Sequence, residues 1–192
     1  DLLAEEAPDL AVSAKTVGRL MADAGITPPR TRRPRGGSRQ RRERMPREGM
    51  LLQADGSEHD WLQGRGPRLT LVGAVDDATG DVEDATFRDH EDATGYLTVL
   101  DRVIRAHGIP LALYTDRHTI FQVPARQVPT IEDQLAGLVP LTHVGRALEE
   151  LGIGWIPASS PQAKGRVERT WGTLQDRLVS ELRRARACTL EE

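Results

Sequence analysis

The order of strand and helix patterns constrains the fold of this 192-residue chain more than any other feature. Three strand patterns joined by tight turns come first, and two further strands then alternate with helices. We expect strands within 50–57, 68–75, 81–87, 109–116 and 154–159, and helices within 92–108, 142–153 and 163–186. Hairpins followed by alternation predict an α/β domain in which helices pack on a mixed five-stranded sheet.

One segment interrupts this order. Residues 120–140 contain several prolines and show no convincing period of either helix or strand. We interpret this stretch as an inserted excursion, with a short helix around 131–138.

A separate helix pattern lies at 13–26, ahead of the domain. Ser13 is a suitable N-cap, apolar residues recur at helical spacing, and Gly25 suits the position just after the helix. The segment is similar to the last helix of a helix-turn-helix domain. A helix that only packs against other segments is an equally good interpretation.

A dense basic block follows this helix. Residues 30–47 contain nine Arg and one acid, a net charge of +8 in a chain whose overall net charge is −3. A basic block beside an acidic body predicts a polyanionic partner, and Arg32, Arg33 and Arg35 are our candidate contacts. The alternative is a solvated linker that binds nothing.

Several classes of protein are excluded by composition. The single cysteine, Cys188, permits neither an internal disulfide nor a cysteine-based zinc site, and it fits a reducing, cytoplasmic setting. No histidine pair has zinc spacing, and no G-x-S-x-G motif is present. No apolar run is long enough for a membrane span. The start carries neither Met nor a signal peptide, so we expect a fragment of a longer protein.

Three carboxylates stand out by their positions. Asp55 interrupts an apolar strand, Asp116 ends another, and Glu168 lies on the last helix among basic residues. If the first and fourth strands are neighbours, Asp55 and Asp116 lie side by side, and Glu168 approaches from the flanking helix. Oxygen ligands without His or Cys suit Mg²⁺. The alternatives are a turn-forming Asp55, a capping Asp116 and an ordinary ion pair for Glu168; Asp76 and Asp77 are expected to be turn residues.

The segments "LQADGS", "YTDRHTIF" and "PASSPQAKGRVERTWGTLQDRL" together resemble the catalytic core of the retroviral-integrase superfamily. They are most similar to bacterial insertion-sequence transposases of the ISNCY-like group. The resemblance covers about 50–182 and implies an RNase H-like fold. It also implies a D…D…E triad holding two divalent ions, Mg²⁺ or Mn²⁺. Matched residue by residue, that triad is Asp55, Asp116 and Glu168.

Two features depart from the family pattern. Arg117 and His118 follow the second Asp where Asn-Gly is common, and the 52-residue step from Asp116 to Glu168 exceeds the usual gap. The excursion at 122–140 accounts for the longer step. The role of His118 stays open between a contact with DNA or water and an ordinary surface residue.

The resemblance implies a DDE transposase that cleaves DNA and transfers the cut strand into a target. It also implies that the protein acts as a homo-oligomer. The expected location is the bacterial cytoplasm, in association with the nucleoid. Its partner is double-stranded DNA, both transposon ends and target. Basic residues at a helix start are electrostatically unfavourable unless a phosphate lies there. The candidate DNA contacts on the last helix and the loop before it are Gln162, Lys164, Arg166 and Arg169. The alternatives are a catalytically inactive DNA-binding protein derived from a transposon and an RNase H-like nuclease.

The chain is thereby divided into four parts. Residues 1–28 are expected to be the C-terminal remnant of a helix-turn-helix region and 29–48 a basic linker. The integrase-like catalytic core occupies 49–185, and 186–192 form a tail.

Overall fold

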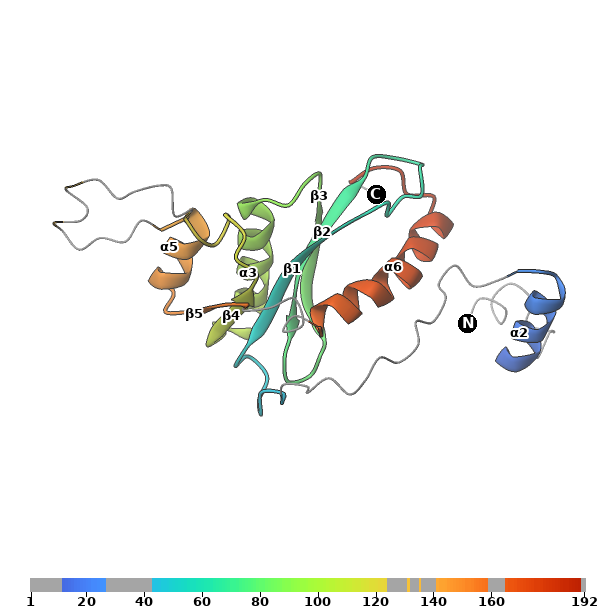
Figure 1. Cartoon of the computed structure of the whole chain (residues 1–192), viewed down its shortest axis with the longest axis horizontal. Helices are drawn as coiled ribbons and strands as arrows, with labels where there is room; N and C mark the ends of the chain where they lie inside the picture. Colours follow the sequence, from blue (N-terminus) through green and yellow to red (C-terminus); the bar gives the residue numbers. More distant parts are fainter. Residues whose placement is uncertain are drawn as a thin grey trace. The chain divides into compact units, whose positions relative to one another are not determined.

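The structure, a computed structural model, describes residues 12–26, 43–123, 131, 135, 141–158 and 165–190 (Figure 1). The chain separates into two compact units, Asp1–Arg41 and Arg42–Glu192. The first unit contains α2 (Ala14–Asp23), and the second contains the sheet and the remaining helices. Most of the predicted helix at 131–138 and the Arg-rich candidates Arg32, Arg33 and Arg35 lie outside the described residues.

Helix α2 begins and ends where the sequence predicts. The Ser13 hydroxyl accepts a hydrogen bond from the Thr16 amide at 3.1 Å, and Gly25 takes a positive φ of 70° just after the helix. None of its residues is buried, and Leu20 and Met21 are exposed among the described residues. Its assignment to a helix-turn-helix region stays a prediction.

The second unit is built on a mixed five-stranded sheet, as predicted. The strands are β1 (Leu52–His59), β2 (Leu69–Asp76), β3 (Val82–Arg88), β4 (Ala112–Thr115) and β5 (Gly154–Pro157). Their order in the sheet is β3-β2-β1-β4-β5. The first three pair antiparallel as a meander, whereas β4 pairs parallel to β1 and β5 parallel to β4. The first and fourth strands are therefore neighbours.

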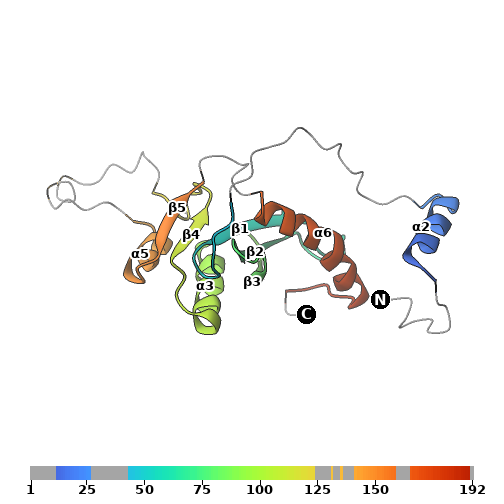
Figure 2. The same cartoon turned by 90° about the horizontal axis from the view of Figure 1, so that it is seen from below.

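Helices cover both faces of this sheet. They are α3 (Ala93–His107), α5 (His143–Glu150) and α6 (Val167–Arg184). Side chains of α3 and α5 form one apolar core with β1, β2 and β4, and α6 forms a second core on the opposite face (Figure 2). Because both faces are covered, every residue of β2 is buried. Among the described residues, no helix combines the length and the apolar character needed to cross a bilayer.

The β2–β3 hairpin closes through Asp76. Its carboxylate accepts hydrogen bonds from the amides of Ala78 and Thr79, and Gly80 takes a positive φ of 87°. This confirms the predicted turn. The segment just before β1 packs here too, since the Arg44 guanidinium donates to the carbonyls of Ala78 and Thr79.

The C-terminal end also packs on the core. Ala187 is buried with the α6 core, and its carbonyl accepts a hydrogen bond from Arg65 Nε at 3.2 Å. The first residues of the segment assigned as a tail thus contact the domain.

Close approach between α6 and the sheet depends on Gly73 of β2. A Cβ at Gly73 would lie 2.8 Å from Trp171 Cη2, 2.9 Å from Ala85 Cβ and 2.9 Å from the Asp84 carbonyl oxygen. The Trp171 ring therefore lies directly over the backbone of β2. A glycine is required at this point because the neighbours include backbone and the rigid ring of a buried tryptophan.

We expect Gly73→Ala to lower the free energy of unfolding by about 1–3 kcal/mol, because the added methyl overpacks the α6 interface. The measurement is urea unfolding followed by tryptophan fluorescence, which reports on this unit because all three Trp lie in it. Gly154→Ala is the matched control, since a Cβ there meets its nearest atom at 3.4 Å, and it should change stability by less than about 0.5 kcal/mol. Equal stabilities of the two variants would contradict this packing.

Candidate active site

Asp55 lies on β1, and Asp116 directly follows the last residue of the neighbouring parallel strand β4. The register pairs Gln53 of β1 with Tyr114 of β4, and Asp55 and Asp116 are each two residues further along the chain. Both aspartates are half-buried. The strand adjacency on which their predicted proximity depends is therefore present.

The chain around Asp116 is held by local hydrogen bonds. Its Oδ1 accepts from the His118 amide at 3.0 Å, and its carbonyl accepts from the Thr115 hydroxyl at 2.8 Å. Trp155 of β5 in turn donates from Nε1 to the Thr115 hydroxyl oxygen at 2.9 Å. Asp116 thus caps its own loop, the alternative weighed from sequence.

A buried tyrosine lies beside these carboxylates. The Tyr96 hydroxyl donates to Glu91 Oε1 at 2.5 Å, and its ring packs edge-on against Phe121. Burial raises the pKa of Tyr96 strongly, and the negative charges of Glu91, Asp55 and Asp116 raise it further. The phenol therefore stays protonated and continues to donate to Glu91.

Glu91 was not singled out by sequence reasoning. A Cβ added to Gly56 would lie 2.7 Å from Glu91 Cδ, so this side chain covers β1 immediately beside Asp55. The sequence signal that could have pointed to a residue such as Glu91 was Tyr96, which lies at a core position of its helix. A buried tyrosine hydroxyl requires a hydrogen-bond partner.

Helix α6 runs along the face of β1 that carries Asp55. The Val167 amide donates to Gln53 Oε1 at 3.4 Å, and Gln175 Nε2 donates to the Ser57 hydroxyl oxygen at 3.0 Å. Because side chains alternate along a strand, Gln53, Asp55 and Ser57 share one face. Glu168 follows Val167 in the first turn of α6, where it is exposed.

The start of α6 is fixed by a buried carboxylate, Asp77. Its Oδ1 accepts from Gln53 Nε2 at 2.6 Å and forms an ion pair with the Arg166 guanidinium. Its Oδ2 accepts from the Met45 amide at 2.8 Å. Asp77 is fully buried, and the Arg166 side chain is 16% exposed. Asp77 is therefore more than the turn residue expected from sequence.

The basic candidates around Glu168 differ in their surroundings. Arg166 points inward to Asp77, which gives it a structural role, and its contact with DNA stays a prediction. Arg169 is exposed on α6. Gln162 and Lys164 lie outside the described residues.

The described side chains contain one tight group of possible metal ligands, and it does not include Asp55, Asp116 or Glu168. Only Glu48, Glu83 and His107 have ligand atoms all within 4.8 Å of one another. Asp55, Asp116 and Glu168 do not meet that spacing as a trio in the described structure, so their joint role as a metal triad stays a prediction.

Comparisons with known proteins place this geometry in context. No protein-family model matches the chain. The chain is 40% identical over 187 residues, 97% of its length, to a protein of Sinorhizobium fredii assigned as a transposase, y4bF. It is 43% identical over 145 residues, 75% of its length, to the transposase for insertion sequence IS1202 of Streptococcus pneumoniae. It spans only 39% and 30% of the lengths of these relatives.

Two solved structures share the fold. The simian T-cell lymphotropic virus intasome, determined with the PP2A regulatory subunit B56 gamma, matches 94% of this chain and 58% of its own chain, with a TM-score of 0.54 and 19% identity. The HTLV-2 integrase catalytic core domain, determined with magnesium in a trimeric form, matches 74% of this chain and 78% of its own, with a TM-score of 0.51 and 17% identity. These likenesses confirm the predicted integrase-like, RNase H-like fold.

We expect Arg166→Met to destabilise the sheet unit by about 3–5 kcal/mol, because it leaves the Asp77 carboxylate buried without its counter-charge. Urea unfolding followed by tryptophan fluorescence measures the change. Asp77→Asn combined with Arg166→Met should cost less than the sum of the single changes. Arg169→Met, on the exposed side of the same helix, is the control and should cost less than about 0.5 kcal/mol. An Arg166→Met protein as stable as this control would show that the ion pair is unimportant.

Proposed function

This chain is a homologue of insertion-sequence transposases with the fold of retroviral integrase catalytic cores, and from this premise we propose that it catalyses metal-dependent DNA cleavage and strand transfer during transposition. The observation that supports this most is that Asp55 lies on β1 and Asp116 directly follows the adjacent parallel strand β4, with α6 crossing the Asp55 face. Because the chain spans only part of its relatives, the proposal concerns the catalytic core of a longer enzyme.

The donor set around Asp55 suits a hard divalent cation. Asp55 on β1 and Asp116 directly after the adjacent strand β4 supply carboxylate oxygens, and like charges gathered in this way favour a cation between them. We assign Asp55, Asp116 and Glu168 as the residues that hold Mg²⁺ or Mn²⁺, two ions per site. When bound, such ions activate the attacking oxygen and stabilise the leaving oxygen of an in-line phosphoryl displacement.

The proposed reaction has two steps of the same kind. In cleavage, a water oxygen forms a bond to phosphorus while the bond to the 3′ oxygen breaks, leaving a 3′-hydroxyl and a 5′-phosphate. In strand transfer, that 3′-hydroxyl attacks a phosphodiester of the target DNA and displaces another 3′ oxygen. One phosphoester bond replaces another in the second step, so no covalent enzyme intermediate is required.

The chain's own residues position the reacting groups. Tyr96 holds Glu91 beside β1, and the hydrogen bonds of Gln53 and Ser57 hold α6 along the strand that carries Asp55. The contacts of Gln53 and Ser57 fix β1 and α6, from which Asp55 and Glu168 project. A preorganised arrangement of this kind is what positioning catalysis requires.

DNA binding is assigned to two groups of residues. Arg32, Arg33 and Arg35 belong to the basic block, and Gln162, Lys164, Arg166 and Arg169 lie at the start of the last helix and before it. Duplex DNA, transposon ends and target alike, is the proposed partner. The solved intasome is an assembly around a related fold, which supports a homo-oligomer for this chain.

We expect Asp55→Asn, Asp116→Asn and Glu168→Gln each to reduce Mg²⁺-dependent DNA cleavage by at least about a hundredfold, because each removes charge from the metal site. The measurement is nicking and strand transfer on duplex DNA with Mg²⁺ or Mn²⁺, including a non-specific nicking substrate because the chain spans part of its relatives. Asp101→Asn is the matched control, because Asp101 lies on the exposed side of α3, where it forms an ion pair with Arg105.

The outcomes separate the alternatives. Full activity of Glu168→Gln would remove Glu168 from the site while leaving the reaction in place. A wild-type protein that binds DNA without ever nicking it would identify an inactive DNA-binding protein. Preferential cleavage of RNA–DNA hybrids would identify an RNase H-like nuclease.

Replacing Arg32, Arg33 and Arg35 by Gln should weaken DNA binding to a similar degree for unrelated sequences, because phosphate contacts carry no sequence information. The slope of log affinity against log salt concentration should fall by about one unit per lost contact. Fluorescence anisotropy with labelled duplexes at several salt concentrations measures both. Arg105→Gln, which removes an Arg from an exposed intrahelical pair, is the control and should leave the slope unchanged. An unchanged slope in the triple variant would identify the block as a linker that binds nothing.

A further inference from the structure

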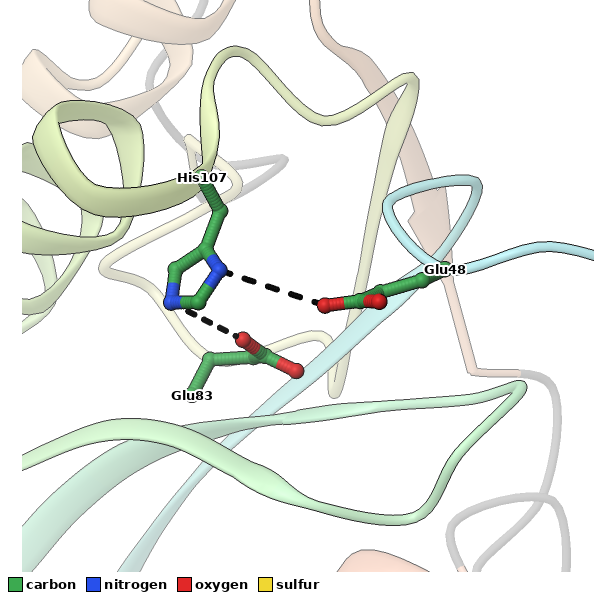
Figure 3. A group of neighbouring side chains, drawn as sticks. All are labelled: Glu48, Glu83 and His107. Atoms are coloured by element: carbon green, nitrogen blue, oxygen red, sulfur yellow. Dashed lines mark ion pairs between the residues drawn. The ribbon is translucent and has the colours of Figure 1, made fainter.

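A second group of possible ligands lies at the far end of α3 from Glu91. It comprises Glu48, just before β1, Glu83 of β3, and His107, the last residue of α3 (Figure 3). His107 Nε2 lies 3.3 Å from Glu83 Oε2, and His107 Nδ1 lies 3.9 Å from Glu48 Oε1. Three chain segments far apart in sequence therefore meet through these side chains.

Glu83 is an unusual residue in this group. Its side chain is only 6% exposed, whereas those of Glu48 and His107 are 57% and 46% exposed. Within the described part of the chain its carboxylate accepts no hydrogen bond, and the imidazole of His107 is its one ion-pair partner. A buried carboxylate that accepts no hydrogen bond destabilises the folded state unless a positive charge lies beside it.

The electrostatic surroundings of Glu83 are acidic. Burial raises its pKa, and the charges of Glu48, Asp76 and Asp81 raise it further, while His107 opposes them. Three other carboxylates thus act on Glu83 against one imidazole.

This group is separate from the candidate active site. Glu91 precedes the first residue of α3 and His107 is its last. A 15-residue helix is about 22 Å long, and Glu91 and His107 lie at opposite ends of α3. A cation bound by Glu83 would not be one of the ions proposed at Asp55 and Asp116.

We propose that Glu48, Glu83 and His107 form a binding site for one Zn²⁺ ion. One imidazole nitrogen and carboxylate oxygens are ordinary zinc ligands, with bonds of about 2.0–2.2 Å. Tetrahedral ligands at that distance lie about 3.3 Å apart, the spacing already present between His107 Nε2 and Glu83 Oε2. Glu48 lies on the Nδ1 side of the ring, so its exposed side chain would have to rotate toward Nε2 to complete the trio, and a water would fill the fourth position.

The ion would join the segment before β1, the start of β3 and the end of α3. Zinc at such a point stabilises the folded state because the unfolded chain has no preformed site. Without an ion, the imidazole of His107 lies between the two carboxylates of Glu48 and Glu83, and the experiment distinguishes this arrangement from a metal site. The inference does not depend on the proposed transposase activity.

The test uses the whole chain without a polyhistidine tag, in a Cys188→Ser background because the exposed thiol is itself a metal ligand. Zn²⁺ binding is measured by calorimetry, and Co²⁺ binding by visible absorption. We expect one ion per chain, and a Zn²⁺-dependent rise in Tm. His107→Gln should weaken binding by at least about tenfold, since even residues that only orient a ligand cost that much. His90→Gln, at an exposed histidine between β3 and α3, should bind as the parent does.

Two further variants make the result decisive. Asp55→Asn should retain the ion, which separates it from any ion at the candidate active site. Glu48→Gln should weaken Zn²⁺ binding without affecting folding, because the Glu48 side chain is exposed. This variant therefore tests the site even if a change at buried Glu83 unfolds the protein. Absence of Zn²⁺ and Co²⁺ binding, or equal binding by the parent and His107→Gln, would overturn the proposal and leave only the contacts of His107 with the two carboxylates.

Discussion

The buried ion pair between Asp77 and Arg166 is the interaction on which the arrangement of this domain depends. Asp77 follows β2 and Arg166 precedes α6, so the pair joins the meander to the last helix across 89 residues of sequence. Gln53 of β1 bonds to both sides, donating to Asp77 and accepting from the Val167 amide. Because a carboxylate without exposure to water requires both a counter-charge and hydrogen bonds, α6 has one favourable starting position.

That starting position decides what α6 can present to β1. From Val167 the helix crosses the strand with Trp171 seated over Gly73, the residue paired with Asp55, and Gln175 bonded to Ser57. The parallel pairing of β1 and β4 independently brings the end of β4 next to Asp55. Two separate constraints, one from sheet topology and one from helix packing, thus act on the same few residues of β1. Their convergence is the physical basis for a site at this place.

The sequence predicted the elements well because their signals are local. The individual strands, the hairpin at Asp76, the cap at Ser13 and the apolar stripe of α6 are each encoded within a few residues. The proximity of Asp55 and Asp116 was predicted only on the condition that the first and fourth strands are neighbours, and the sheet meets that condition. Asp77 and Glu91 were missed for the opposite reason, since their partners lie on other elements. Asp76 and Asp77 look alike in sequence, yet one caps a turn and the other neutralises an arginine 89 residues away.

The same contrast changes the interpretation of the basic residues around Glu168. Read along the sequence, Lys164, Arg166 and Arg169 form one positive cluster with a single acid. In the fold, the charge of Arg166 is balanced by Asp77, so the surface at the start of α6 is less positive than the sequence indicates. Glu168 in the first turn is favoured by the helix dipole and needs no basic neighbour to stabilise it. We therefore expect the Glu168 carboxylate to be available to a cation, and the Arg-rich block at 30–47 to supply the main electrostatic attraction for DNA.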